Sequence, residues 1–219
     1  MKEIENYLQP TSIIDCDHEM IKEKAEEVTK RREESIEKAR NLFYFVRDEI
    51  KYNPYLPRYL PEHFRASQTL ARKQGFCVQK AVLLVALSRA LGISARLGFA
   101  VIRNHLLPEK IAAMLITNVL PDHGYAELFL HGKWVKATSA FDLELCRKNR
   151  IIPVEFDGKN DAKFHSHTQD GQLHIEYLLD RGPYDDVPVD SIREWDTAVL
   201  KPGMKSEILG DDPYPMDKK

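Results

Sequence analysis

The residue best suited to chemistry in this sequence is Cys77, which closely precedes the most apolar run of the chain, residues 82–87. A thiol in this position is expected at the N-terminus of a buried helix. Unpaired backbone N–H groups and the helix dipole there favour the thiolate over the thiol. Because the thiolate is the form of cysteine that attacks carbon, Cys77 is a candidate nucleophile. The alternative is a small core residue, a common role for an intracellular cysteine.

A nucleophilic cysteine in acyl transfer needs a base, and often a third group that orients the base. Residues 125–130 and 133–137 have strand-like composition on either side of His131-Gly132. This pattern predicts an antiparallel hairpin with a two-residue loop. Glu127 then lies opposite Lys136, and this favourable cross-strand charge pair supports the register.

The same register predicts the base and the orienting group. His123 falls opposite Ala140, and Asp142 lies two residues further along the same face of the hairpin. Such a diagonal separates Cα atoms by roughly 7–8 Å, a gap that side chains can close. Taken one at a time, His123 reads as a loop histidine and Asp142 as a turn-capping aspartate. Together with Cys77 they form a candidate Cys-His-Asp triad.

Helices and strands around these residues are predicted from periodicity. Apolar residues at helical spacing indicate helices at about 17–29 and from Ser35 to about residue 50, with a short helix at about 67–73. The segment after Cys77 is apolar on nearly all sides and is capped by Gly92, so we expect the central buried helix there. Alternation over about 93–101 predicts a strand.

Bulk properties indicate an ordinary soluble globular enzyme. The chain has 219 residues, 43% hydrophobic and 30% charged, with a formal net charge of -2, which gives no reason to expect nucleic acid or an anionic membrane as a partner. Three cysteines without a Cys-x-x-Cys pair predict neither a disulfide framework nor a structural zinc site. With no signal peptide evident, we expect a cytoplasmic protein without a membrane span.

Two sequence blocks resemble the transglutaminase-like superfamily. The first is Ala66-Ser67-x-Thr69-Leu70, Gly75-x-Cys77 and the apolar segment up to Arg96; the second is His123-Gly124-Tyr125-Ala126-Glu127-Leu128, followed by Gly132-Lys133-Trp134-Val135. The resemblance covers roughly residues 36–145. It implies an α+β, papain-like fold in which a buried Cys-bearing helix packs on an antiparallel sheet. By match, Cys77 is the nucleophile and His123 the general base.

The chain departs from the family pattern at the third position of the triad. The family usually places its Asp about four residues after the strand tryptophan, where this sequence has Thr138. Asp142 is the best replacement in the predicted register. For the oxyanion hole we expect the Cys77 backbone N–H. A side-chain donor is also needed, and Gln68, Gln74 and Tyr52 remain alternatives for it.

Three regions are expected along the chain. Residues 1–35 form an N-terminal helical extension, residues 36–155 the catalytic core, and residues 156–219 a loop-rich C-terminal extension that packs on the core and ends in a frayed tail. His165, His167 and His174 show no regular spacing, so we expect surface loop histidines rather than a metal site.

The predicted function is cysteine-dependent acyl transfer from a peptide, protein or small amide substrate. It involves a thioester on Cys77, no cofactor and no metal. Water is the expected acceptor, because the chain has no recognisable calcium loops. Transfer to an amine shares every step up to the thioester. The alternatives are an arylamine-type acetyltransferase and a non-catalytic protein-binding module that retains the fold. The sequence leaves the oligomeric state open.

Overall fold

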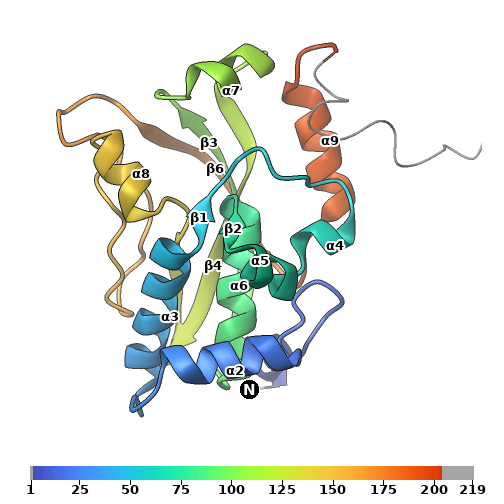
Figure 1. Ribbon diagram of the computed structural model, residues 1–219, viewed down its shortest axis with the longest axis vertical. Helices are drawn as coiled ribbons and strands as arrows, with labels where there is room; N and C mark the ends of the chain where they lie inside the picture. The colour runs from blue at the N-terminus through green and yellow to red at the C-terminus, as the bar shows by residue number, and fades with distance from the viewer. Residues whose placement is uncertain (1, 204–219) are drawn as a thin grey trace, which may run out of the picture.

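The helix that begins at Cys77 lies at the centre of the fold. The structure is a computed structural model, which describes residues 2–203. Helix α6 (Cys77–Ala90) is buried along almost its whole length, from Val78 to Arg89. Figure 1 shows it in the middle of the molecule, packed against the sheet. Gly92 follows its end with a positive φ of 75°, which a glycine adopts without strain. The predicted central helix and its cap are confirmed.

The sheet has four strands in the order β5-β4-β3-β6, and every neighbouring pair is antiparallel. The strands are β3 (Ala95–Asn104), β4 (Val119–Leu130), β5 (Lys133–Ala137) and β6 (Ile175–Tyr184). Leu130 pairs with Lys133 and Glu127 with Lys136, as the sequence predicted. His131 and Gly132 both have positive φ, as a tight two-residue hairpin loop requires. The predicted hairpin register is confirmed.

The remaining helices surround α6 and the edges of the sheet. They are α1 (Lys2–Glu5), the 3-10 helix η1 (Asn6–Leu8), α2 (Glu19–Val28), α3 (Ser35–Glu49), α4 (Pro61–Phe64), α5 (Ala66–Arg72), α7 (Glu109–Met114), α8 (Leu143–Lys148) and α9 (Val189–Val199). Helices α2, α3 and α5 pack on α6, whereas α7 and α9 lie towards one end of the molecule (Figure 1). None of the helices in residues 2–203 is long and apolar enough to cross a membrane.

Both predicted extensions contribute to the single hydrophobic core. From the first 35 residues, Ile14 and Ile21 are fully buried. The C-terminal region was expected to be loop-rich, but it supplies β6, which pairs along β3, and the amphipathic helix α9. The expectation of a loop-rich extension is therefore wrong for residues 175–199. The tail predicted at residues 210–219 lies outside the described residues.

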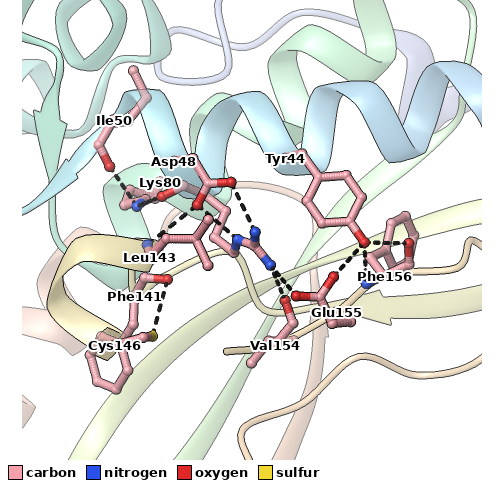
Figure 2. A network of polar contacts seen from close by, with 11 residues as sticks. Tyr44, Asp48, Ile50, Lys80, Phe141, Leu143, Cys146, Val154, Glu155 and Phe156 are labelled. Carbon is pink, nitrogen blue, oxygen red and sulfur yellow. Dashed lines mark hydrogen bonds and ion pairs between the residues drawn. The ribbon is translucent and has the colours of Figure 1, made fainter. Parts of the chain in front are cut away.

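A network of polar contacts joins the end of α3 to α6, to Leu143 and to the segment at residues 154–156 (Figure 2). The Lys80 ammonium, fully buried in α6, donates to the carbonyl oxygens of Arg47 at 3.0 Å and Ile50 at 2.6 Å. Burial lowers the pKa of Lys80 to about 7. These bonds satisfy carbonyls at the end of α3, which its own helix leaves without partners. The chain then enters β1 (Lys51–Tyr52), which pairs in parallel with β2 (Gln74–Gly75) and brings Tyr52 opposite Gly75, just before Cys77.

Candidate active site

Cys77 is the first residue of α6 and opens onto a cavity of about 340 Å³. His123, from β4, lines the same cavity. Cys77 is half-buried, whereas the other two thiols, Cys16 and Cys146, are buried, and all three are free. The structure therefore brings the predicted nucleophile and the predicted base to one cavity, and it leaves Cys77 as the cysteine most open to a substrate.

Gly124 sets the spacing between β4 and the start of α6. A Cβ atom at this position would lie 2.9 Å from the Cα of Val78, closer than real Cβ atoms approach a backbone. The backbone N–H groups of Gly124 and Val78 both act on the Cys77 thiol. The glycine thus allows β4 to approach the first turn of α6, and the preceding residue, His123, lines the same cavity as Cys77.

The protonation states of the pair differ from the sequence expectation. Burial, followed by the negative charge of Asp122, raises the pKa of Cys77 to about 12, although Arg58 and the N–H groups of Gly124 and Val78 oppose the rise. Burial lowers the pKa of His123 to about 3. The expectation that the helix N-terminus favours the thiolate is wrong here, because desolvation outweighs it. Both pKa shifts favour the neutral forms of the pair, a thiol and an imidazole.

Alkylation of Cys77 by iodoacetamide is expected to keep accelerating as the pH rises above about 9. The thiolate is the reactive form, and its fraction continues to grow until the pH passes the raised pKa. Mass-spectrometric labelling of a Cys16→Ala/Cys146→Ala variant measures this rate, with glutathione as the unperturbed thiol. A rate that levels off below about pH 8 would instead reveal a thiolate–imidazolium pair.

In the wild-type protein, which has all three cysteines, iodoacetamide should label Cys77 before Cys16 and Cys146. Burial raises the pKa of Cys16 and raises that of Cys146 to about 11. All three thiols therefore have raised pKa values, and exposure decides the order of labelling.

Asp142 lies at a different place from the one predicted. It is the N-cap of α8, where its Oδ1 accepts a hydrogen bond from Leu145 N at 3.0 Å and its Oδ2 accepts one from Tyr52 N at 2.9 Å. The β4–β5 ladder ends at the pair Ala126–Ala137, so the expectation that His123 lies opposite Ala140 is wrong. Among the described residues, no hydrogen bond joins Asp142 to His123.

Of the three candidate oxyanion donors, only Tyr52 lines the cavity that contains Cys77. Gln68 is exposed, and exposed Gln74 accepts a hydrogen bond from Asn53 Nδ2. Burial raises the pKa of Tyr52, so its hydroxyl keeps its proton as a donor. Its ring is held edge-on against Phe141, with the ring centroids 4.9 Å apart.

A buried charged cluster also lines the cavity, and the sequence analysis missed it. Arg58 Nη1 lies 3.8 Å from Asp122 Oδ2, and Arg58 Nε lies 3.7 Å from Asp196 Oδ2. Arg58 Nε, Asp122 Oδ2 and Asp196 Oδ2 are buried without a hydrogen-bond partner, whereas Arg58 Nη2 donates to Pro54 O at 3.0 Å. Burial raises the pKa of both carboxyl groups, that of Asp196 to about 7, while Arg58 opposes the rise. The sequence contained one signal for this charged cluster: Asp122 directly precedes His123, the candidate base.

One wall of the cavity is apolar and comes from α7, α9, the segments beside them and the start of β4. Its side chains are Leu106, Leu107, Ile111, Met114, Leu115, Leu120, Val199 and Leu200. Ile116 N donates to Val199 O and Lys201 N to Met114 O, both at 2.9 Å, so hydrogen bonds join the two segments. A ligand that reaches Cys77 therefore meets a hydrocarbon surface as well as the polar groups.

The position of His174 differs from the prediction that it is a surface loop histidine. His165 and His167 are exposed as predicted, but His174 is buried and lines the cavity, and burial lowers its pKa to about 4. Within residues 2–203, no group of three His, Cys, Asp or Glu side chains is placed to hold a metal ion. The polar groups of this cavity thus include a thiol, two imidazoles, the Tyr52 hydroxyl and the Arg58 cluster.

Comparisons with known proteins identify the family of this chain. A family model described as "Transglutaminase-like superfamily" matches residues 22–139, more than half of the chain. No curated protein sequence gives a significant match.

Two solved structures match parts of this chain. The first is named a "putative cysteine protease" from Cytophaga hutchinsonii, with a TM-score of 0.50 and 18% identity over 84% of this chain and 59% of that one. The second is named a "putative protease" from Parabacteroides distasonis, with a TM-score of 0.40 and 17% identity over 55% of this chain and 23% of that one. The chain thus spans about three-fifths of the first neighbour's length. The α+β fold, the Cys-bearing helix and the family match together show that this chain belongs to the transglutaminase-like superfamily.

Proposed function

We propose that the protein is a cysteine-dependent hydrolase that cleaves a peptide or other amide bond through a thioester on Cys77. The observation that carries this proposal is the shared cavity: the half-buried thiol at the start of α6 and the buried imidazole of His123 both line it. A nucleophile and a base that converge on one concave, largely apolar cavity are typical of an acyl-transfer site.

Because the pKa shifts favour a neutral thiol and a neutral imidazole, the thiol must lose its proton during the attack, which is general-base catalysis. As the Cys77 Sγ attacks the substrate carbonyl carbon, His123 takes the thiol proton and a carbon–sulfur bond forms. The carbonyl oxygen becomes an oxyanion, which in this proposal the Cys77 backbone N–H and the Tyr52 hydroxyl stabilise; the position of Cys77 at the start of α6 and of Tyr52 in the cavity lining supports these roles. The carbon–nitrogen bond then breaks, and the imidazolium gives its proton to the leaving amine.

The second half of the cycle releases the acid. Water attacks the thioester while His123 takes one of its protons, the carbon–sulfur bond breaks, and the proton returns to the Cys77 sulfur. Transfer to an amine would differ only in the attacking group. The apolar wall from α7 and α9 supports a substrate with a bulky apolar side chain on the acyl side.

Trapping the thioester tests this proposal. With N-acetyl-leucine p-nitroanilide, an acid quench during turnover should reveal one acetyl-leucyl group on Cys77 by mass spectrometry, and p-nitroaniline should be released. The matched control is the Cys16→Ala/Cys146→Ala variant, which should behave in the same way. N-acetyl-glycine p-nitroanilide should react more slowly, because it leaves the apolar wall empty.

Two results would contradict the proposal. The absence of an adduct with both the anilide and the more reactive p-nitrophenyl ester would rule out the cysteine enzyme, and an adduct on another residue would rule out Cys77. Added n-butylamine distinguishes hydrolysis of the thioester from transfer of its acyl group to an amine. If the butylamide is the main product, the enzyme is a transferase and not a hydrolase.

A further inference from the structure

We propose that Tyr177, from β6, positions the His123 imidazole in the place where the family uses an aspartate. This inference rests on the proposed function of Cys77 and His123. The Tyr177 hydroxyl lies 3.5 Å from His123 Nε2, and the two rings meet edge to face with centroids 5.9 Å apart. Asp142 caps α8 instead, and Thr138 stands at the family's Asp position.

The sheet topology explains why a residue so distant in sequence reaches the histidine. Strand β3 lies between β4 and β6, with Ala100 paired to His123 on one side and Ile102 paired to Tyr177 on the other. Register shifts occur near these pairs in both ladders, and such irregularities locally re-aim side chains. The hydroxyl and the imidazole therefore meet across β3.

The hydroxyl is itself held in place. Phe164 N donates to Tyr177 Oη at 3.3 Å, and the Phe164 ring lies against His123 with centroids 4.9 Å apart. Thr138 Oγ1 is buried without a close hydrogen-bond partner, yet Thr138 lies near enough to lower the pKa of Tyr177. Burial dominates and raises that pKa to about 12, so Tyr177 keeps its proton at neutral pH. Tyr177 is thus a neutral, fixed hydrogen-bonding group.

This arrangement predicts the tautomer of His123. In this proposal Tyr177 Oη accepts a hydrogen bond from the Nε2–H group of His123, which leaves Nδ1 with the lone pair that a base needs. An aspartate in this place would stabilise the imidazolium as well as orient the ring. A neutral tyrosine orients the ring without supplying that charge, which agrees with a histidine that stays neutral.

Other groups near His123 could also shift the pKa of its imidazole. Tyr125 lies beside it on β4, Phe164 and Tyr177 cover its ring, and further ionisable side chains share its cavity. These ionisable cavity side chains are Tyr52, Tyr55, Arg58, Cys77, Asp122, His174 and Asp196. None of them has a hydrogen bond to the His123 ring within residues 2–203; the one described is that of Tyr177.

Nitrogen-15 NMR of the histidine side chains tests the inference without any substrate. In the wild type, two-bond couplings should show His123 as the Nε2–H tautomer, and an Nδ1–H tautomer would overturn the proposal. Tyr177→Phe should mix the two tautomers and lower kcat by about tenfold with little change in KM, the effect of one neutral hydrogen bond. Tyr184→Phe, on the same strand but packed on Phe99, is the matched control and should change neither readout.

A second variant keeps the inference testable if Tyr177→Phe does not fold. Thr138→Asp introduces a carboxylate at the family's position and should raise the pKa of His123 by more than about one unit, from its present value near 3. An unchanged His123 titration in Thr138→Asp would overturn the inference. The two proposals can fail separately. If the His123 tautomer changes in Tyr177→Phe as predicted but no thioester forms on Cys77, then Tyr177 positions His123 and the proposed function is wrong.

Discussion

Cys77→Ala is expected to lower kcat/KM on N-acetyl-leucine p-nitroanilide by at least about 10⁴-fold, because members of a nucleophilic triad act as a unit and the loss of one removes the covalent route. The fold should survive, since the side chain is half-buried and alanine is a better helix former than cysteine. Release of p-nitroaniline gives the rate, and circular dichroism during thermal unfolding reports the fold.

Cys146→Ala is the control for this experiment. Cys146 is buried in α8, outside the cavity lining, so its replacement should cost some stability while leaving kcat/KM within about twofold. If Cys77→Ala kept more than about one hundredth of the activity, another nucleophile would be carrying out the reaction.

The central helix and the hairpin could be predicted because their signals are local. A run that is apolar all round requires burial, and Gly92 marks where it ends. The two-residue loop at His131-Gly132 fixes the pairing of both strands, and the Glu127–Lys136 pair fits it. These elements carry Cys77 and His123, which both line one cavity.

The position of Asp142 could not be predicted in the same way. Same-face reasoning requires the ladder to continue, but Ala137 is the last residue paired with β4, and it also bridges to Ala162 in a distant segment. Beyond it the chain turns into α8, for which Asp142 supplies a side-chain cap. Aspartate is a favoured helix N-cap, so Asp142 before Leu143-Glu144-Leu145 also indicated the start of a helix. The prediction that the strand continues to Asp142 left this signal unused.

The edge strand and the protonation states were missed because they depend on long-range packing. Strand β6 exposes Leu178 and Leu179 and buries few residues, so its sequence lacks a clear strand alternation. The pKa of Cys77 depends on how much chain from elsewhere covers it, which no local pattern records. The helix N-terminus was identified correctly, but its effect on the thiol was smaller than that of burial.

Gly124→Ala is expected to reduce activity more than its effect on stability would suggest. The added Cβ would meet the Val78 backbone at 2.9 Å, and because a backbone atom cannot rotate away, β4 and the start of α6 must separate. Overpacking of this kind costs about 1–3 kcal/mol of unfolding free energy. A shift on the order of 1 Å between reacting groups can cost about 100-fold in rate, so kcat/KM should fall by about 10- to 100-fold.

Ile21→Val separates the two effects of Gly124→Ala. Ile21 is fully buried in α2, outside the cavity lining, and the substitution costs about 0.5–1.5 kcal/mol. Urea unfolding gives the stability of both variants, and anilide hydrolysis at low temperature gives the activity of the folded fraction. Equal activity loss in the two variants would show that general stability, and not the Cys77–His123 spacing, is what Gly124 protects. Loss confined to Gly124→Ala would identify the glycine as the spacer that lets the base reach the thiol.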